Sequence, residues 1–449
     1  MSEANNRLIS LDVFRGMTIA GMVLVNNPGT WSHIYDPLEH ASWHGLTPTD
    51  WIFPFFLFIV GTAIPIALGK RIEEGVTGKV YYKIVSRALM IFALGLSMSA
   101  IPFFQFTATD APDSLKMLIW LAMTGGLLFL LLRNFKVAGV LLGLSVVGII
   151  GLNLGGYNVV PYNFSTMRIP GVLQRIAVCY LIVSIIFLHT SWKQQLGIAG
   201  FLLLGYWLIM TVIPVPGCEV TTIDDKACNL AAWLDRTIIT ENHIWRSAKV
   251  FDPEGILSTI PAIATTISGV LTGTWLTHRD KKQSTGDETD NQSLVTVYSS
   301  LNRVSGMFFF GVMLLAVGYI WNSYFPMNKA LWTSSYVLVT SGLALLCLGS
   351  CYWLIDIKGY KAWAKPFVIF GMNALALFVF SGIFARMIGA YRVTGADGQP
   401  VAVQKWIFDS VFMSVAQPVD ASLMYAISFI LLWLFLMWLF YRKNIYIKV

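Results

Sequence analysis

Long apolar segments alternate with short polar loops along almost the whole chain. Each segment is close to the roughly 20 residues that a helix needs to cross about 30 Å of hydrocarbon, where a helix satisfies its own backbone hydrogen bonds. The predicted membrane spans are 10 to 28, 51 to 70, 83 to 103, 115 to 132, 137 to 155, 170 to 189, 194 to 214, 255 to 277, 303 to 324, 331 to 355, 366 to 388 and 421 to 441. The pattern predicts an all-α polytopic membrane protein with about twelve transmembrane helices. The first span lacks the cleavage signal of a secretory peptide, so we expect it to be retained.

Composition supports this class. Of the 449 residues, 56% are hydrophobic and only 12% are charged. The surface of an ordinary soluble domain needs more charge than this, so the composition excludes that class.

Basic residues on every second loop predict the orientation of the chain. They are Arg7, Lys70, Arg71, Lys79, Lys83, Arg87, Arg133, Lys136, Lys193, Arg279, Lys281, Lys282, Lys358, Lys361, Lys365, Arg442, Lys443 and Lys448. Because positive charge favours the cytoplasmic side, both termini are predicted to lie in the cytoplasm and the polar loop around His40 outside. The net charge of +7 is mostly this topological signal, so it does not indicate nucleic-acid binding.

Two cysteines, Cys218 and Cys228, fall in a long loop on the predicted outer side. Oxidising conditions there permit a disulfide between them, which we predict. The other three, Cys179, Cys347 and Cys351, fall inside spans, where we expect apolar packing.

A polar run at residues 278 to 297 divides the apolar segments into two groups. Its composition predicts a flexible cytoplasmic linker. We therefore expect a single transmembrane domain, residues 1 to 449, built from helical bundle halves of about 1 to 277 and about 298 to 449.

Several charged residues lie near or within the membrane, where each is costly unless it pairs or functions. Asp12 and Arg15 are spaced i to i+3 and can meet on one helix face. They form either a structural ion pair or part of a site for an anionic ligand.

A second charged group surrounds two predicted outer helix ends. Arg168 and Arg175 bracket the start of the sixth span, and Arg175 lies too deep for its side chain to reach the interface easily. Asp252 and Glu254 open the eighth span, where the helix dipole favours acidic residues. Helix capping alone explains the presence of Asp252. A buried ion pair with Arg175 or Arg168 would explain the charged residues at both helix ends.

The polar loop after the first span carries His40 and His44 and follows Asn26. A histidine can act as a general base or accept an acyl group, and an amide can polarise a carbonyl. The i to i+4 spacing of the histidines also permits a metal site on a helix, but Gly45 and Pro48 predict a turn and no third ligand is clustered, so we expect no metal. For the remaining boundary histidines we expect structural roles: His33, His189, His243 and His278.

Sequence blocks spread along the chain resemble the transmembrane acetyltransferases typified by lysosomal heparan-α-glucosaminide N-acetyltransferase. The blocks are residues 7 to 57, which include 11 to 16, 25 to 26 and 40 to 47; 168 to 175; 214 to 218 with Cys228 and 235 to 236; 252 to 257; 328 to 336; 356 to 359; and 371 to 373. They keep their order along nearly the whole chain.

This resemblance implies transfer of acetyl from cytoplasmic acetyl-CoA to the amine of a terminal glucosamine across the membrane. It assigns the active-site histidine to His40 and a nearby asparagine to Asn26. The family has asparagine where this chain has His44, and the helices near 115 to 132 and 137 to 155 look like an added hairpin.

The same resemblance gives further expected roles. Because the phosphates of CoA cannot cross hydrocarbon, a basic inner mouth is expected, with Arg15 and Arg303 as candidates and Asn373 lining the channel. On the outer side, Asp50, Asp252 or Glu254 would orient histidine or sugar hydroxyls. The acceptor-binding candidates are His44, Arg168, Arg175, Asp252 and Glu254.

Two other functions stay open. Twelve helices with a central linker also describe many solute transporters, but no broken-helix signature appears in matching halves. The acceptor could instead be a hydroxyl or amine of an envelope glycan. The lysosomal enzyme's large N-terminal lumenal part has no counterpart in this sequence, so we expect a bacterial inner membrane with the active-site loop facing the periplasm. The family also suggests a homodimer.

Overall fold

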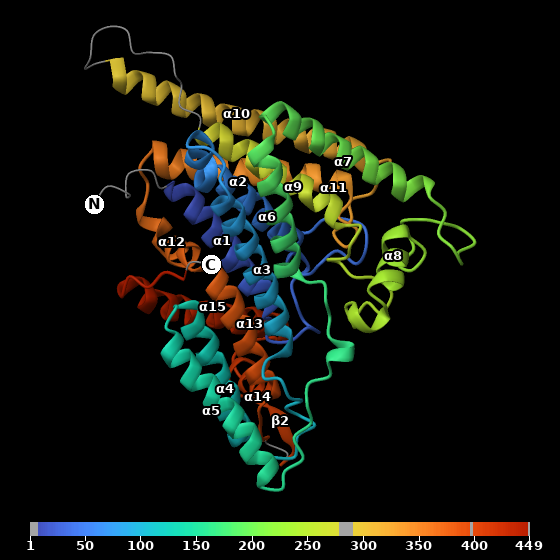
Figure 1. Cartoon of the computed structure of the whole chain (residues 1–449), viewed down its shortest axis with the longest axis vertical. Coiled ribbons are helices and arrows are strands. Elements are labelled where there is room, and N and C mark those ends of the chain that lie inside the picture. The colour runs from blue at the N-terminus through green and yellow to red at the C-terminus, as the bar shows by residue number, and fades with distance from the viewer. Residues whose placement is uncertain (1–7, 278–290, 396–397, 448–449) are drawn as a thin grey trace. The chain divides into compact units, whose positions relative to one another are not determined.

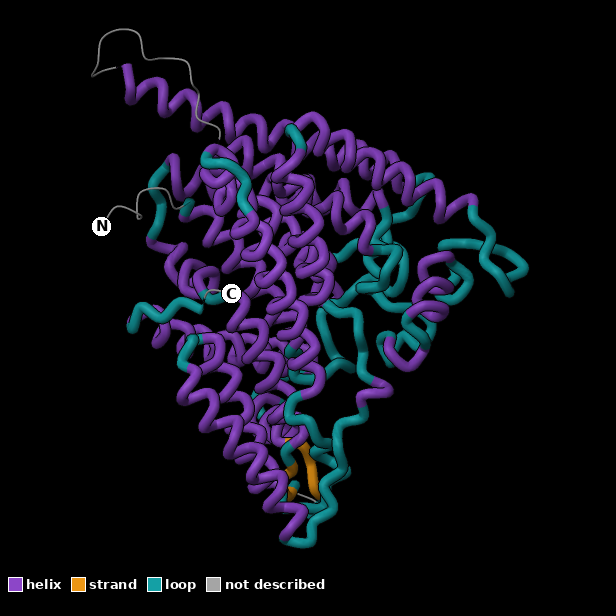
Figure 2. Tube along the Cα trace, in the orientation of Figure 1, coloured by secondary structure: helices purple, strands orange, loops and turns teal. Residues whose placement is uncertain are grey.

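Helices make up nearly all regular structure in this computed structural model, which describes residues 8–277, 291–395 and 398–447 (Figures 1 and 2). The predicted all-α class is therefore confirmed. The α-helices are α1 Ile9–Asn26, α2 Ile52–Glu73, α3 Gly78–Ala100, α4 Asp113–Leu131, α5 Phe135–Leu154, α6 Val172–His189, α7 Trp192–Val212, α8 Leu230–Ile238, α9 Thr259–Thr277, α10 Asn291–Asn322, α11 Ser334–Cys351, α12 Lys365–Met372, α13 Ala374–Ala390, α14 Val403–Ile407 and α15 Pro418–Arg442.

Ten helices within the described ranges are long and apolar enough to cross a membrane, or eleven if the bent pair α12 and α13 counts as one span. The protein is therefore a multi-pass membrane protein. The predicted span 255 to 277 corresponds to α9, which is outside this count. Six residues of α9 are threonines, and most of its residues are buried in the protein.

The chain forms two compact units that are interleaved along the sequence. The first unit holds the chain up to Thr18, His40–Ala93 and Arg168–Gly371. The second unit holds Ile19–Glu39, Leu94–Met167 and the chain from Met372 onward. Helices α1 and α3 each contribute to both units.

The predicted linker lies partly outside the described residues, since residues 278–290 are not described. Helix α10 begins at Asn291, so the last part of the run predicted as a linker is helical instead. The predicted roles of Arg7, His278, Arg279, Lys281, Lys282 and Lys448 also fall outside the described ranges.

Glycines bring the backbones of α2 and α9 into close contact in the first unit. A Cβ atom at Gly269 would lie 2.1 Å from the carbonyl oxygen of Phe58, and one at Gly273 would lie 2.4 Å from that of Thr62. No larger residue fits at either position, and small residues are the usual means by which membrane helices approach this closely. This packing fixes the helix that follows the His40 loop against the helix that follows Glu254.

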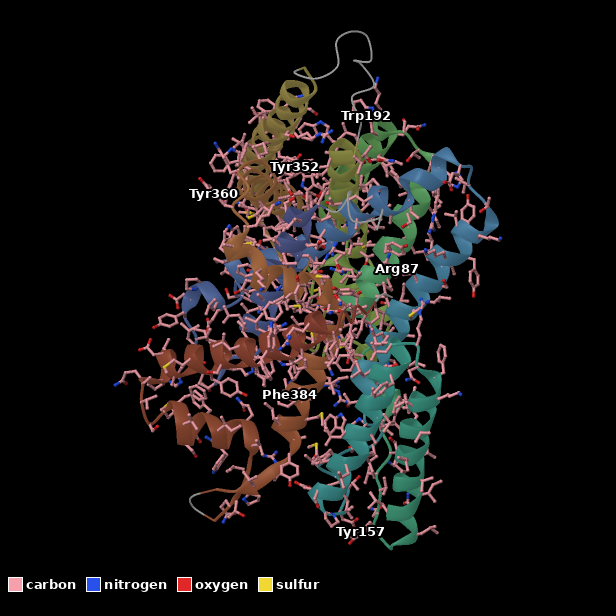
Figure 3. All side chains as sticks on the ribbon, turned by 90° about the vertical axis from the view of Figure 1, so that its left-hand side faces the viewer. Arg87, Tyr157, Trp192, Tyr352, Tyr360 and Phe384 are labelled. Atoms are coloured by element: carbon pink, nitrogen blue, oxygen red, sulfur yellow. A yellow bond between two sulfur atoms is a disulfide. The ribbon has the colours of Figure 1, made fainter. Side chains whose placement is uncertain are left out.

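Three aromatic residues labelled in Figure 3, Trp192, Tyr352 and Tyr360, lie toward one end of the first unit. Trp192 begins α7, and the ammonium of Lys193 lies 5.6 Å from the centre of its ring. Aromatic rings beside lysines are typical of a membrane interface. This end carries basic residues that the sequence assigns to the cytoplasm.

The second unit contains the hairpin of α4 and α5 and the strand pair β1 Arg392–Thr394 and β2 Pro400–Ala402. The strands are antiparallel, with Val393 opposite Val401. At the start of α4, the ammonium of buried Lys116 donates hydrogen bonds to the carbonyl oxygens of Phe106 and Thr109 and forms an ion pair with Asp113.

Candidate active site

The His40 loop, residues 40–47, ends in a local helix start. Thr47 precedes the short 3₁₀ helix Pro48–Trp51, which leads directly into α2. The Oδ2 atom of Asp50 accepts hydrogen bonds from the backbone N–H and the hydroxyl of Thr47, at 3.1 and 3.0 Å. An acidic side chain that reaches back to the residue before a helix, with proline at the first position, is a common way to begin one.

His40 and Asp50 form a close pair within this loop. The Nδ1 atom of His40 lies 2.7 Å from Oδ1 of Asp50, and the N–H of Ala41 donates to Oδ2 at 3.2 Å. The side chain of Asp50 is 1% exposed, whereas that of His40 is 49% exposed. The carboxylate therefore orients a ring that remains accessible from outside the protein.

Lys329 completes this group. Its Nζ atom lies 2.9 Å from Nδ1 and 3.2 Å from Nε2 of His40, and 3.5 Å from Oδ1 of Asp50. Burial lowers the pKa of the Lys329 ammonium, although Asp50 and Glu254 act in the opposite direction. Lys329 was not predicted from the sequence as a site residue. Its position on a predicted outer loop, where basic residues are scarce, was the available signal.

The backbone around Lys329 is tied to the His40 loop. This segment, the Lys329 turn, comprises residues 327–333. The carbonyl oxygen of Met327 accepts a hydrogen bond from the N–H of Gly45 at 2.8 Å, and Gly45 has a φ of +117°, which favours glycine. From the start of α11, the hydroxyl of Tyr336 donates to the carbonyl oxygen of Asp50 at 2.7 Å.

His44 has different partners. Its Nε2 atom lies 2.9 Å from Oδ1 of Asp224, and its Nδ1 atom lies 3.4 Å from Nδ2 of Asn328. The neighbouring Trp43 donates through Nε1 to the carbonyl oxygen of Ile223 at 2.9 Å. The two histidines of the loop are thus held by separate groups, and only His40 faces a buried carboxylate.

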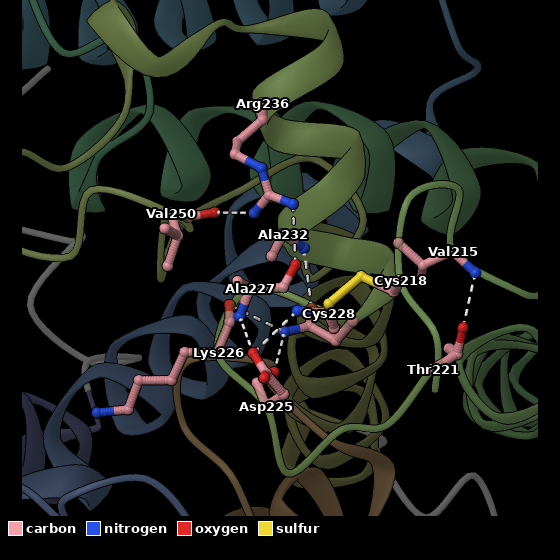
Figure 4. Close-up of a disulfide and its surroundings, with 11 residues drawn as sticks. Val215, Cys218, Thr221, Asp225, Lys226, Ala227, Cys228, Ala232, Arg236 and Val250 are labelled. Atoms are coloured by element: carbon pink, nitrogen blue, oxygen red, sulfur yellow. Dashed lines mark hydrogen bonds between the residues drawn. A yellow bond between two sulfur atoms is a disulfide. The ribbon is translucent and has the colours of Figure 1, made fainter.

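The loop that carries Ile223 and Asp224 is closed by a disulfide between Cys218 and Cys228 (Figure 4). Within it, Oδ1 of Asp225 accepts from the N–H of Cys228 at 3.0 Å, and the hydroxyl of Thr221 accepts from the N–H of Val215 at 2.7 Å. From α8, Arg236 donates to the carbonyl oxygens of Ala227 and Val250. The covalent closure and these bonds give the partners of Trp43 and His44 a defined position.

Arg168, Asp252 and Glu254 form an ion-pair cluster, here the Arg168 cluster. Nε of Arg168 donates to Asp252 at 2.8 Å, and Nη2 donates to both Asp252 and Glu254. The side chains of Asp252 and Glu254 are 0% and 9% exposed. Although burial alone would lower it, the pKa of Arg168 is raised by Glu254 and Asp252. Of the two pairings open from the sequence, the structure contains the one with Arg168.

Arg175 instead reaches the backbone next to that cluster. Its Nη2 atom donates to the carbonyl oxygen of Gly255 at 3.1 Å and to the hydroxyl of Ser258. Its guanidinium also lies 5.0 Å from the ring centre of Trp332. Because Trp332 packs on Tyr336, which bonds to Asp50, the buried arginine and the His40 loop share one packed layer.

Asp235 of α8 supports the turn that carries Asp252 and Glu254. Its carboxylate accepts from the N–H groups of Ile256, at 2.9 Å, and Asp252, at 3.3 Å. Burial raises the pKa of Asp235 to about 6, even though these two hydrogen bonds lower it.

The other predicted site residues have partners or positions of their own. Arg15 pairs with Asp12 at 3.2 Å and contacts the carbonyl oxygen of Gly371 at 3.4 Å, and Arg303 lies on α10. Asn26 ends α1 in the second unit. Asn373, at the break between α12 and α13, uses its amide to bind Ile445 and Ile447.

Metal binding receives no support in the parts of the chain that the structure describes. They contain no group of three or more histidine, cysteine, aspartate or glutamate side chains that could hold a metal ion.

Comparison with known proteins places these features in a family. The chain is 26% identical over 418 residues to the mouse protein named heparan-alpha-glucosaminide N-acetyltransferase, which covers 83% of this chain and 53% of the mouse protein. The human protein of the same name is 25% identical over 428 residues, covering 86% of this chain and 54% of the human protein. The chain thus spans about half the length of the curated relatives it matches. These similarities confirm the resemblance inferred from the sequence blocks. A family model, described as a domain of unknown function (DUF5009), matches residues 7–238, and because these include the His40 loop and more than half of the chain, the chain belongs to that family.

Proposed function

We propose that this protein is a transmembrane acetyltransferase that moves acetyl from cytoplasmic acetyl-CoA to the amine of a terminal glucosamine or related amino sugar on the outer side of the membrane. One observation carries the proposal: the accessible ring of His40 is bound at Nδ1 by buried Asp50. It occurs in a chain that is similar over most of its length to two proteins named as N-acetyltransferases.

The geometry supports a base or nucleophile at Nε2 of His40. A carboxylate only accepts hydrogen bonds, so Asp50 holds the tautomer with hydrogen on Nδ1 and the lone pair on Nε2. In direct transfer, Nε2 takes a proton from the acceptor ammonium, and the free amine attacks the thioester carbon. The new C–N bond forms as the C–S bond breaks. The CoA thiolate takes the amine's second proton, and the first passes from His40 to solvent.

An acetyl-histidine intermediate uses the same atom. Nε2 would attack the thioester carbon, and CoA would leave as the thiolate when the C–S bond breaks. The thiolate would take one proton from the acceptor ammonium, and the free amine would attack the acetyl carbon. The bond from this carbon to Nε2 would break, and the second proton of the amine would pass to solvent. The two routes differ in whether labelled acetyl stays on the protein when no acceptor is present.

The donor is proposed to enter from the cytoplasmic side. Arg15 and Arg303 would attract the CoA phosphates, and Asn373 would line the path of the pantetheine arm. Arg15 retains 27% side-chain exposure beside Asp12, which leaves part of its guanidinium accessible. Asn26 is proposed to steady the thioester oxygen.

The acceptor is proposed to bind at the outer side, near His44 and the Arg168 cluster. His44, Arg168, Arg175, Asp252 and Glu254 would orient the sugar, either directly or by shaping the loops that contact it. We place the protein in a bacterial inner membrane with the His40 loop facing the periplasm, and we propose a homodimer from the family resemblance.

Acetyl transfer by purified protein in detergent tests the proposal. Wild type, His40→Ala and His44→Ala would be incubated with acetyl-labelled acetyl-CoA and glucosamine or a short glucosaminide. Acetylated sugar from wild type and His44→Ala, but not from His40→Ala, is the expected result. Binding of acetyl-CoA without transfer to any amino sugar would contradict the amine acceptor and favour a glycan hydroxyl. Absence of acetyl-CoA binding would contradict the enzyme and favour a transporter.

A further inference from the structure

Trp245 lies in the segment between α8 and α9, on the predicted outer side, and is 40% exposed. Several residues around it in the sequence are both polar and exposed: Glu241, Asn242, Arg246, Ser247 and Lys249. This composition is typical of a segment that faces water. A tryptophan ring offers a large flat apolar surface together with one N–H donor, so it suits a ligand that is apolar on one side and polar on the other.

Two hydrogen bonds hold the backbone on either side of Trp245. Before it, the carbonyl oxygen of His243 accepts from the N–H of Ile169 at 2.9 Å. After it, the carbonyl oxygen of Val250 accepts from the guanidinium of Arg236 on α8 (Figure 4). The ring is therefore presented from a fixed segment, which lowers the entropy that ordering the segment would cost on binding.

The Arg168 cluster lies beside this ring. The guanidinium carbon of Arg168 is 5.9 Å from the ring centre of Trp245. Among the described residues, the hydrogen bonds of Arg168 all use Nε and Nη2, and its side chain is 29% exposed. Its Nη1 atom can therefore donate to a hydroxyl of a ligand that covers the ring.

A flat apolar ring next to an exposed donor matches the surface of a pyranose sugar. A pyranose carries C–H groups on its faces and hydroxyls around its edge. It can bury a C–H face against an aromatic side chain while its hydroxyls accept hydrogen bonds from polar neighbours, as in other sites that combine apolar walls with a few polar groups.

A row of charged side chains connects the ring of Trp245 with that of His40. Nη2 of Arg168 donates to Glu254, and the carboxylate of Glu254 acts in turn on the ammonium of Lys329, whose pKa it raises against the effect of burial. The Nζ atom of Lys329 lies 2.9 Å from Nδ1 of His40. Three charged side chains therefore stand between the two rings. A sugar stacked on Trp245 is thus a different unit from the sugar whose amine meets His40.

We propose that the acceptor is a saccharide chain of at least two units, and that Trp245 stacks on the second sugar while the terminal glucosamine lies at His40. This inference rests on the proposed acetyl transfer. It adds a second binding position to the site and assigns that position to an aromatic residue.

Kinetics with two acceptors test the proposal: free glucosamine, and a disaccharide whose terminal glucosamine is linked to a second sugar. In wild type, KM should be about tenfold lower for the disaccharide than for glucosamine, which is the scale of one aromatic contact. Trp245→Ala should remove this difference by raising KM for the disaccharide, while kcat and the KM values for glucosamine and acetyl-CoA change less than about twofold. Trp245→Phe should keep most of the difference, because a smaller ring still stacks.

Trp192→Ala is the matched control, because Trp192 is also exposed and also lies beside a cation, Lys193, but belongs to the predicted cytoplasmic end. It should keep the wild-type difference between the two acceptors. Equal changes in Trp192→Ala and Trp245→Ala would mean that both tryptophans anchor the protein at a membrane interface, and would overturn the proposal. Equal KM values for the two acceptors in wild type, or an unchanged difference in Trp245→Ala, would overturn it as well.

Tryptophan fluorescence gives a readout without acetyl transfer, so it separates failure of this inference from failure of the proposed function. The disaccharide would be titrated into the purified protein without acetyl-CoA. We expect its addition to change the emission of wild type and Trp192→Phe but not that of Trp245→Phe, in which the covered ring no longer emits as tryptophan. This pattern in a protein that transfers no acetyl would support the saccharide site and contradict the proposed function. The same change of emission in Trp245→Phe would refute the inference.

Discussion

In the His40 loop one buried carboxylate faces an accessible ring, whereas in the Arg168 cluster two buried carboxylates face a single guanidinium. Both lie in the first unit and both use charges that are costly near a membrane. In the Arg168 cluster, the guanidinium donates hydrogen bonds to the carboxylates of both Asp252 and Glu254. In the loop, the ring of His40 lies beside Asp50 and Lys329 and is 49% exposed, so a substrate can reach it. The two groups therefore differ in how much of their polar surface remains accessible from outside the protein.

The largest effect is expected from His40→Ala. Removing the proposed base should lower kcat for acetyl transfer by about 10²-fold to 10⁴-fold. Because the ring is half exposed, the temperature of unfolding in detergent should change little. If His40→Ala unfolds at a much lower temperature and recovers activity on cooling, its loss of activity comes from unfolding. His40 would then have a structural role instead.

Asp50→Asn should weaken catalysis less than removal of the ring. An amide can donate to Nδ1 and so stabilise the wrong tautomer, and we expect kcat to fall by about a hundredfold or more. The pH-rate profile, measured beside that of Thr49→Val as a neighbouring control, checks this. Unchanged kcat in Asp50→Asn would show that the carboxylate does not set the tautomer.

Arg168→Met should act mainly on stability. It leaves the carboxylates of Asp252 and Glu254 buried without their shared cation, and breaking such a pair costs about 3 kcal/mol or more. Chemical denaturation followed by tryptophan fluorescence would measure the loss. If Arg168→Met keeps the wild-type midpoint of denaturation but has a raised KM for the sugar, Arg168 would instead bind the acceptor directly.

Replacing Cys218 and Cys228 together by serine should give a moderate loss of stability. Closing a loop across 10 residues stabilises a fold by about 2 to 3 kcal/mol in the chain-entropy model. Since this loop holds Trp43 and His44 but not His40, kcat should fall less than in Asp50→Asn. An equally large fall would mean that the outer loop positions the His40 pair.

The smallest effect is a pH dependence from Asp235. Its pKa is about 6 in the folded protein and 3.8 in its ordinary state, so its contribution to stability is complete below about pH 4 and is lost as pH rises through 6. Asp235→Asn should therefore flatten the change in unfolding temperature between these values. The same slope in both proteins would mean that another group titrates there.

Apolar periodicity was sufficient to predict the helical class and most spans, because each membrane helix satisfies its backbone within its own segment. Thr47, Pro48 and Asp50 form a local helix start, and His40 and Asp50 are only 10 positions apart, so both could be selected from one short segment. Lys329 could not be selected in the same way, since its contact with His40 exists only after α10 and α11 bring a distant turn to the loop. The choice between Arg168 and Arg175 as the partner of Asp252 likewise depended on tertiary packing.

Asn373 shows a different limit. An asparagine at a helix break suggests a polar channel, but its amide binds the backbone at Ile445 and Ile447, near the end of the described chain. The sequence gives the residue type but not its hydrogen-bond partners. An asparagine that binds the backbone of its own protein therefore looks the same in a sequence as one that binds a ligand.

Transfer across a sealed membrane tests the account most directly. Wild type and His40→Ala would be reconstituted in vesicles with labelled acetyl-CoA on the side of the chain termini and glucosamine only on the side of the His40 loop, with protein orientation determined by protease accessibility. We predict labelled N-acetylglucosamine on the His40 side for wild type and none for His40→Ala. Product that forms only when both substrates are on one side, or equally well without His40, would contradict it.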